Sequence, residues 1–226
     1  MINLQIGKPL NIKFPIVYRY MDKQFIDLFF DEGKLRISSF DKFRKYPDEI
    51  RGDKSEGGGS ITGKSDKEGF TFHLMTRVGK NGYMLSTSLL HSQSIMDEFE
   101  TDGVFRIKDP INFAAAISNS ILGNDQVFVG FCNYQDGRII EKEIKGLSAK
   151  DFTNEEGNFI IGGPGMAKRT NEMIGNGIDL MYLKDNKYQV QSEFRFVWTI
   201  RNQFFEMNEF LDIECKEAIQ YCERIK

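Results

Sequence analysis

Residues 190–200, VQSEFRFVWTI, carry a polar or charged side chain at every second position of an otherwise apolar segment. Successive side chains of a β-strand point to opposite faces, so this alternation predicts a strand with one polar and one apolar face. The polar face would carry Gln191, Glu193 and Arg195. The apolar face would hold the strand in the core through Val190, Phe194, Phe196 and Trp198. The polar row is either the solvated side of a sheet or the wall of a site.

Short apolar runs of this kind recur along the chain and are separated by glycine-containing turns, which is typical of an antiparallel sheet. Three hairpins are predicted, over 70–90, 126–145 and 178–200, with the Asn81–Gly82 pair as the clearest turn signal. Further strands are expected over 14–21, 34–40 and 104–107.

Helical patterns lie between these strands. A helix is expected to follow residue 22 and to end at Gly33, and another to begin at Asp109 with Pro110 in its first turn. A third, short helix is predicted over 215–226. The chain has no internal repeat and no clear boundary, so its 226 residues are read as a single α+β domain.

Two glycine-rich segments, 41–69 and 157–177, are predicted as long loops. Loops of such length are usually functional or disordered rather than simple connectors. The first carries the charged residues Arg44, Arg51, Asp53 and Glu56, so acceptor recognition or closure over a bound ligand is a hypothesis for it, beside a plain solvated loop. Lys168 and Arg169 give the second segment a possible contact with an anionic substrate.

Composition excludes several classes of protein. The formal net charge of −3 argues against non-specific coating of nucleic acid, although not against a local basic groove. Three cysteines without CxxC spacing and only two histidines disfavour a zinc site, so no metal is expected. No apolar run approaches roughly 18 residues, and the first residues lack a signal-like apolar core. We therefore expect a cytoplasmic protein with no membrane partner.

Three short motifs at wide intervals carry polar side chains on predicted strands: VYRYM, MLSTSLL and QSEF. Each has an ordinary structural interpretation. Arg19 can stack on a neighbouring tyrosine at the surface, Ser86-Thr87-Ser88 can form a turn or a helix cap, and Gln191 with Glu193 can be a solvated strand face.

Taken in order, these motifs resemble those of the Arg–Ser–Glu class of ADP-ribosyltransferases. Members of that class have an arginine on the first core strand, a Ser-Thr-Ser strand, and a Gln-x-Glu or Glu-x-Glu strand. The matching residues here are Arg19, Ser86-Thr87-Ser88, and Gln191 with Glu193. The opening YRYMDKQFIDLFFDEGKL, a strand and helix followed by G-x-L, is also similar to the superfamily. The resemblance implies split antiparallel β-sheets flanked by helices.

Segment 41–69 departs from the minimal pattern of that class. It resembles instead a loosely defined group of uncharacterised bacterial and phage proteins, which share an FR…RxD…EG loop and a late EFR strand. The resemblance to this group implies no activity. Segment 41–69 is therefore interpreted as a long insertion within a single domain.

The resemblance implies roles for the motif residues. Cleavage of the nicotinamide–ribose bond of NAD develops positive charge on the ribose, and Glu193 would stabilise that charge as carboxylates do in glycoside hydrolases. Arg19 would hold the pyrophosphate or ribose through its planar fork, Gln191 would orient the acceptor, and Ser86 would hydrogen-bond Glu193. Tyr18, Thr87, Ser88 and Phe99 would complete the NAD site, with Phe105 as an alternative aromatic platform. Arg44, Arg51, Tyr182, Tyr188 and Arg195 are candidates for contact with the acceptor.

The leading expectation is thus an NAD-dependent ADP-ribosyltransferase, with NAD as substrate, acting as a bacterial or phage toxin or defence effector. Its acceptor would be protein, RNA or DNA, and an antitoxin or inhibitor protein is a possible partner. Two alternatives stay open: a non-catalytic module that binds NAD, ADP-ribose or nucleic acid, and an NAD glycohydrolase.

Overall fold

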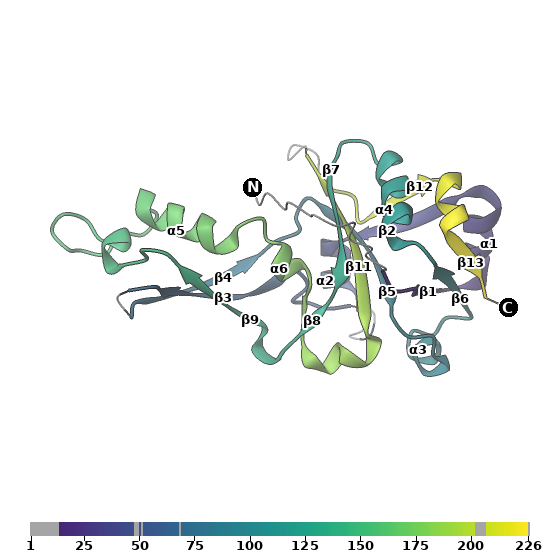
Figure 1. Ribbon diagram of the computed structural model, residues 1–226, viewed down its shortest axis with the longest axis horizontal. Coiled ribbons are helices and arrows are strands. Elements are labelled where there is room, and N and C mark those ends of the chain that lie inside the picture. The colour runs from purple at the N-terminus through teal and green to yellow at the C-terminus, as the bar shows by residue number, and fades with distance from the viewer. Residues whose placement is uncertain (1–13, 48–49, 51, 68, 202–206, 226) are drawn as a thin grey trace, which may run out of the picture.

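A computed structural model describes residues 14–47, 50, 52–67, 69–201 and 207–225. It is an α+β fold with a large, mostly antiparallel sheet and a smaller sheet in a projecting arm (Figure 1). The eight strands of the central sheet are β1 (Val17–Met21), β2 (Lys34–Ser39), β5 (Gly82–Ser88), β6 (Gly103–Ile107), β7 (Asn124–Phe131), β11 (Glu193–Ile200), β12 (Phe210–Glu214) and β13 (Cys222–Arg224).

The helices are α1 (Lys23–Glu32), α2 (Phe40–Lys45), α3 (Gln93–Glu98), α4 (Pro110–Asn119), α5 (Pro164–Ile174) and α6 (Ile178–Met181). Four 3₁₀ segments complete the helical elements: η1 (Asp136–Arg138), η2 (Ala149–Phe152), η3 (Asn186–Gln191) and η4 (Lys216–Tyr221). None of the helices in the described ranges is long and apolar enough to cross a bilayer.

One face of the central sheet packs against α1, α4 and η4, and this contact forms the main core. Phe194, Phe196 and Trp198 of β11 lie in it, as the alternation in the sequence predicts. Phe113 of α4 packs edge-on to Phe196 with ring centroids 5.3 Å apart. The opposite row of β11, Glu193 and Arg195, is buried as well, so it is not a solvated face.

The ends of two helices follow the sequence signals. α1 ends at Gly33, which has the left-handed φ of 78° and donates its N–H to Phe29 O over 2.8 Å. A Cβ at this glycine would lie 2.7 Å from the backbone nitrogen of Lys216, so the close approach of η4 requires glycine here. α4 begins with Asp109, whose side chain accepts from the Asn112 N–H over 3.1 Å.

The central sheet is split where β1 and β2 meet β5. β1 joins one end of β5 through the single pair Tyr18–Ser88, and β2 joins the other end through Ser38–Met84 and Ser39–Tyr83. Between these points the described strands give β5 no partner on that edge. The other edge of β5 is paired with β11 along its whole length.

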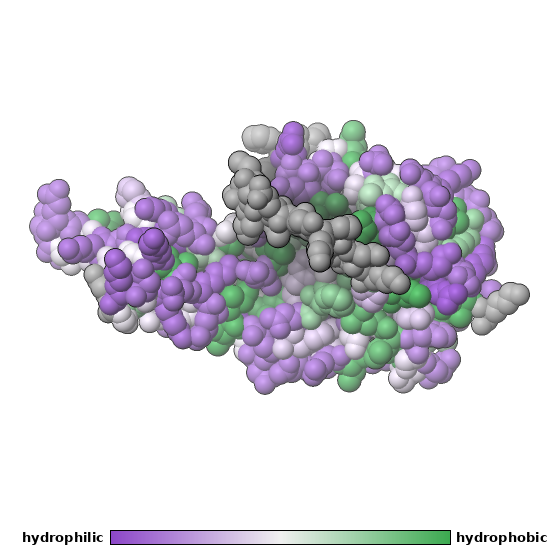
Figure 2. Space-filling view, in the orientation of Figure 1, coloured by the Kyte–Doolittle hydropathy of each residue, from purple (hydrophilic) through white to green (hydrophobic). Residues whose placement is uncertain are grey.

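The arm consists of β3 (Gly58–Ser65), β4 (Thr71–Arg77) and β9 (Ile139–Ile144), covered by α5. β3 runs antiparallel to β4 and parallel to β9. A separate apolar cluster that includes Ile61, Phe152 and Met173 forms its core. Figure 2 shows that the visible surface of the arm is mainly hydrophilic. Two further short strands, β8 (Asn133–Tyr134) and β10 (Leu183–Lys184), pair in parallel between arm and sheet.

All three predicted hairpins are wrong, because the strands in each have partners elsewhere. β4 pairs with β3 while β5 belongs to the central sheet, and β7 pairs with β11 while β9 pairs with β3. β10 pairs with β8 and leads into η3, so the segment before β11 is helical. Alternation identified the strands, but it carries no information about which strands pair.

The two predicted long loops are also partly wrong. Segment 41–69 contains most of α2 and the whole of β3, and segment 157–177 contains α5. The predicted helix at 215–226 is a 3₁₀ turn followed by β13. Val190 is 63% exposed and precedes β11, so it does not share the apolar face of that strand.

Candidate functional site

A cleft with a volume of about 760 Å³ lies at the split of the central sheet. Its wall includes the three sequence motifs, which come from β1, β5 and the start of β11 and lie far apart in the sequence. The predicted site residues that line it are Tyr18, Arg19, Ser86, Thr87, Ser88, Phe99, Gln191, Glu193 and Arg195. The structure therefore brings together the positions on which the family resemblance rests.

Arg19 lies in the split itself. Its Nη1 donates a hydrogen bond of 2.7 Å to the carbonyl of Ser86, on the part of β5 that has no strand partner on this edge. The Nε atom is buried and has no hydrogen-bond partner within the described residues. Burial lowers the pKa of the guanidinium to about 10, against the opposing influence of Glu193, so Arg19 is cationic at neutral pH. A buried donor without a partner beside a cleft favours an acceptor on a ligand.

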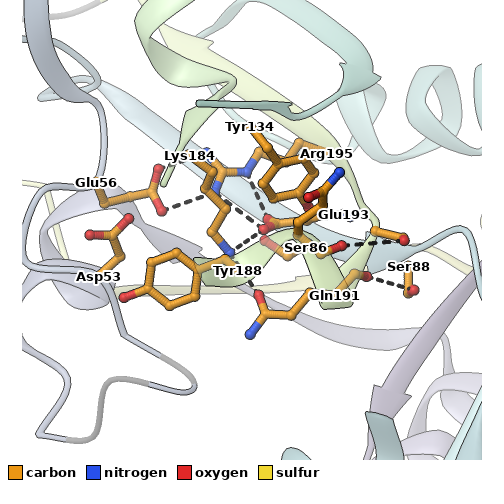
Figure 3. A network of polar contacts seen from close by, with 12 residues as sticks. Asp53, Glu56, Ser86, Ser88, Tyr134, Lys184, Tyr188, Gln191, Glu193 and Arg195 are labelled. Carbon is orange, nitrogen blue, oxygen red and sulfur yellow. Dashed lines mark hydrogen bonds and ion pairs between the residues drawn. The ribbon is translucent and has the colours of Figure 1, made fainter. Parts of the chain in front are cut away.

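Glu193 is the first residue of β11 and lies opposite Ser88. Its side chain is buried, and its carboxylate accepts from Arg195 Nε over 2.7 Å and from Lys184 Nζ over 2.5 Å (Figure 3). Burial alone would raise the pKa of this carboxyl, but the charges and hydrogen bonds of Arg195 and Lys184 hold it well below its usual range. Glu193 is therefore ionised at neutral pH.

Arg195 lies on the same face of β11 and is fully buried. Besides Glu193, its guanidinium binds both carboxylate oxygens of Glu56, over 2.6 and 2.9 Å, and the Met181 carbonyl over 2.5 Å. Burial alone would lower the pKa of Arg195, but the influence of Cys132, Glu193 and Glu56 raises it above its ordinary value. Arg195 is thus an internal bridge between two acids, with few donor positions left for an acceptor molecule.

The sequence analysis named Glu56 only as part of a charged loop and did not identify Lys184 at all. Glu56 comes from the insertion, and Lys184 from the short strand β10. Both are buried. Lys184 enters the site by its contact with Glu193, and Glu56 enters it by its contact with Arg195, which lies far away in the sequence. The only signal was the RxDKSEGG stretch, whose acidic residues lie in an otherwise flexible composition.

The Ser-Thr-Ser motif holds the end of β11 through contacts other than the predicted one. Thr87 Oγ1 donates to the Phe194 carbonyl, and Ser88 Oγ donates to the Gln191 carbonyl, both over 2.7 Å. Ser86 lies opposite Arg195 in the ladder, and no hydrogen bond in the described chain joins its hydroxyl to Glu193. The predicted Ser86–Glu193 bond is therefore not present; Lys184 and Arg195 orient Glu193 instead.

Gln191 also differs from its predicted setting. It ends η3 rather than lying on a strand, because Ser192 has a left-handed φ of 43° and interrupts the extended backbone. Its Oε1 accepts from Lys184 Nζ over 2.8 Å, and its Nε2 donates to the Ile50 carbonyl over 3.0 Å. Gln191 remains in the wall of the cleft, but its amide is occupied by protein groups.

Aromatic rings form part of the wall of the cleft. Tyr18 stacks on His91 with centroids 5.2 Å apart, and Phe99 lies 6.2 Å from the ring of Tyr20. Both Tyr18 and Phe99 line the cleft, whereas Phe105 is fully buried in the main core. The alternative of Phe105 as a platform for a ligand is therefore wrong.

The remaining candidates within the described residues lie outside the wall of the cleft. Arg44 donates to the carbonyls of Glu56 and Val78 and pairs with Asp41, so it fixes the insertion. Tyr188 is buried and its ring lies 4.7 Å from Lys184 Nζ. Tyr182 packs against Gly130. Lys168 and Arg169 belong to α5 in the arm. Arg51 lies outside the described residues.

In the described ranges no group of three or more His, Cys, Asp or Glu side chains is placed to hold a metal ion. Comparisons of the chain with protein-family models, with curated proteins and with solved structures returned no match.

Proposed function

We propose that the protein is an NAD-dependent ADP-ribosyltransferase that moves ADP-ribose from NAD to a macromolecule: a protein, an RNA or a DNA. One observation carries the proposal. Arg19, the Ser86–Ser88 segment and Glu193, which match the motifs of that enzyme class, line one cleft where the sheet is split. Ordinary surface residues at these three places would have no reason to share a cavity.

The charges of the cleft fit the chemistry. The ionised carboxylate of Glu193 can stabilise the positive charge that develops on the ribose as the bond to nicotinamide breaks. Electrostatic stabilisation of this kind is worth roughly 10²- to 10³-fold in rate. Arg19 supplies a cation with a free donor for the pyrophosphate, because it forms no ion pair within the described residues while Lys184 and Arg195 are matched by Glu193 and Glu56.

The shape of the cleft also suits a nucleotide. A volume of about 760 Å³ is within the range of small-molecule sites, which is about 300–1,000 Å³. Aromatic and aliphatic side chains such as Phe25, Leu28 and Phe99 line it beside the charged groups. Thr101, also in its wall, has a buried hydroxyl without a partner in the described part of the chain, and offers a second hydrogen bond to a ligand.

Incubation of the protein with NAD tests the proposal. Release of nicotinamide together with transfer of ADP-ribose to cell protein or nucleic acid, detected by mass spectrometry, is the expected result. Release without transfer would identify a glycohydrolase instead. No release with any acceptor would contradict both enzymatic functions.

A module that binds NAD or ADP-ribose without cleaving it is the second candidate, and one observation favours it. Both carboxylate oxygens of Glu193 are already bonded to Lys184 and Arg195, so the group is less available than a solvated carboxylate. Oε2 accepts from both Lys184 Nζ and Arg195 Nη2, whereas in the described chain Oε1 accepts from Arg195 Nε alone, so one lone pair of Oε1 remains for a ribose hydroxyl. Binding of NAD by calorimetry with no nicotinamide release would support this candidate.

A further inference from the structure

Glu193 belongs to a buried ionic chain in the wall of the cleft, and this chain joins the strand β11 to the insertion. The order of contacts is Glu56, Arg195, Glu193 and Lys184. Figure 3 shows Arg195 and Lys184 at the Glu193 carboxylate, and Glu56 beyond Arg195. Every member of the chain is less than 9% exposed. Buried charges are unfavourable unless they are paired with good geometry, so an arrangement of this length needs a reason.

The insertion presents Glu56 on a rigid loop. Arg138 donates to the Ser55 carbonyl and pairs with Asp53, while Arg44 donates to the Glu56 carbonyl over 2.8 Å. The loop turns at Gly57, whose φ is 66° and whose N–H donates to Glu56 Oε1 over 3.2 Å. The carboxylate of Glu56 is therefore fixed before it reaches Arg195.

Lys184 approaches Glu193 from the other side. Its ammonium group contacts Glu193 Oε2 and Gln191 Oε1 and lies over the ring of Tyr188. The backbone N–H of Glu193 donates to the Tyr134 hydroxyl over 2.7 Å, which holds the start of the strand. These contacts restrict both the position and the rotamer of the Glu193 side chain.

We infer that Glu56, acting through Arg195, and Lys184 are positioning residues that aim the Glu193 carboxylate at the cleft. The inference rests on the proposed function, in which Glu193 faces the ribose of NAD. It assigns a role to the inserted loop, which is outside the motifs of the enzyme class. A misplacement of about 1 Å of a catalytic group lowers rates by on the order of 10²-fold, so such residues affect turnover strongly.

A purely structural ion pair is the opposing interpretation, and the arm supplies a matched control for it. Arg169 is also buried, and it pairs with Asp151 over 2.9 Å and with Glu172 over 2.8 Å. None of these three residues lines the cleft. Asp151→Asn thus weakens a comparable ion pair without touching the site.

The pKa of Glu193 distinguishes the two interpretations, because a loss of stability alone would not change it. The charged and titratable groups that face it from the surrounding elements are Arg19, Glu56, Cys132, Tyr134, Tyr182, Lys184 and Arg195. Lys184 and Arg195 are the cations that hold the Glu193 pKa low. Loss of Lys184 must therefore shift the protonation of Glu193 to higher pH.

The experiment compares nicotinamide release across pH for wild type, Lys184→Met, Lys184→Arg, Glu56→Gln and Asp151→Asn, each checked for folding by circular dichroism. Lys184→Met and Glu56→Gln are expected to lower kcat by about tenfold or more while KM for NAD changes less. Because Glu193 stays ionised in wild type, its protonation should not limit turnover there at low pH. In Lys184→Met a loss of activity on the acid side should appear at higher pH than in wild type, and Lys184→Arg should reverse this change. A folded Lys184→Met with the kcat and pH profile of wild type would overturn the inference, and so would equal changes in Asp151→Asn. If Lys184→Met does not fold, the kcat of Glu56→Gln decides.

A second measurement does not depend on NAD cleavage. Carboxyl ¹³C NMR of protein labelled at glutamate follows Glu193, whose signal is identified by its loss in Glu193→Gln. The wild-type signal should stay ionised to the lowest pH at which the protein is folded, and should titrate at higher pH in Lys184→Met. No turnover in wild type together with this shift contradicts the proposed function alone. Turnover in wild type without the shift contradicts the positioning role alone.

Discussion

The central sheet and the projecting arm each bury an arginine between two carboxylates, but they use it differently. In the arm, Arg169 pairs with Asp151 and Glu172 and donates to the carbonyls of Lys145 and Gly146. In the sheet, Arg195 pairs with Glu193 and Glu56, and Glu193 borders the cleft. The carboxylates of the arm are partly exposed, whereas those of the sheet are less than 6% exposed.

This contrast separates structural charge from functional charge. A buried ion pair that is satisfied by backbone carbonyls and lies away from any cavity needs no ligand to explain it. The sheet has in addition Arg19, a cation without a carboxylate partner in the described chain, beside a cleft of about 760 Å³. The unmatched cation, and not the buried arginine, is the stronger sign of a binding site.

Replacement of the two arginines by methionine tests this comparison most severely. Arg195→Met should lower the free energy of unfolding by about 3–5 kcal/mol, because it leaves two buried carboxylates without their shared cation. Arg169→Met should lower it less, because water reaches Asp151 and Glu172. Urea unfolding followed by circular dichroism measures both, and a larger loss in Arg169→Met would contradict the comparison.

Arg19→Lys should weaken binding of NAD and ADP-ribose by about tenfold or more. The substitution keeps a positive charge but removes the planar fork and its buried Nε donor, and a hydrogen bond to a charged group is worth about 1.5–3 kcal/mol. Isothermal titration calorimetry gives the dissociation constants. Arg106→Lys, on the neighbouring strand and outside the wall of the cleft, is the control. An unchanged affinity in Arg19→Lys would remove Arg19 from the site.

Thr101→Val should have the smallest effects of these substitutions. It should not lower the free energy of unfolding, but it should weaken binding of NAD. Removal of a buried hydroxyl that has no partner in the described residues should leave the free energy of unfolding unchanged or raise it slightly. If the hydroxyl binds the ligand, affinity for NAD should fall by about 0.5–1.5 kcal/mol, a change of a few-fold. A loss of stability with unchanged affinity would show that Thr101 serves the fold and not the cleft.

The sequence predicted the parts of the site that depend on local pattern and motif. Alternation placed Phe194, Phe196 and Trp198 in the core, and the three motifs indicated residues that the fold brings to one cleft. The hairpins failed because an alternating segment shows its apolar face but not its neighbour. The interruption of the strand at Ser192 depends on one left-handed residue that has no distinctive composition around it.

The roles of Glu56 and Lys184 in the site could not be predicted from the sequence, for a different reason. Neither lies in a periodic pattern, and each becomes part of the site only through contacts with β11. The insertion looks like a solvated loop because it is charged and rich in glycine. In the folded protein Asp53 is paired with Arg138 and Glu56 with Arg195, and this pairing exists only in the tertiary structure.

Nicotinamide release by wild type and by Glu193→Gln, measured side by side with NAD, tests the central claim most directly. Wild type should release nicotinamide, and Glu193→Gln should lower the rate by at least about 10²-fold, since it removes the charge that stabilises the ribose. Because Glu193 is buried between two cations, the variant must first be shown to be folded under the assay conditions. Equal release by folded Glu193→Gln and wild type, or none by wild type with any acceptor, would contradict the account.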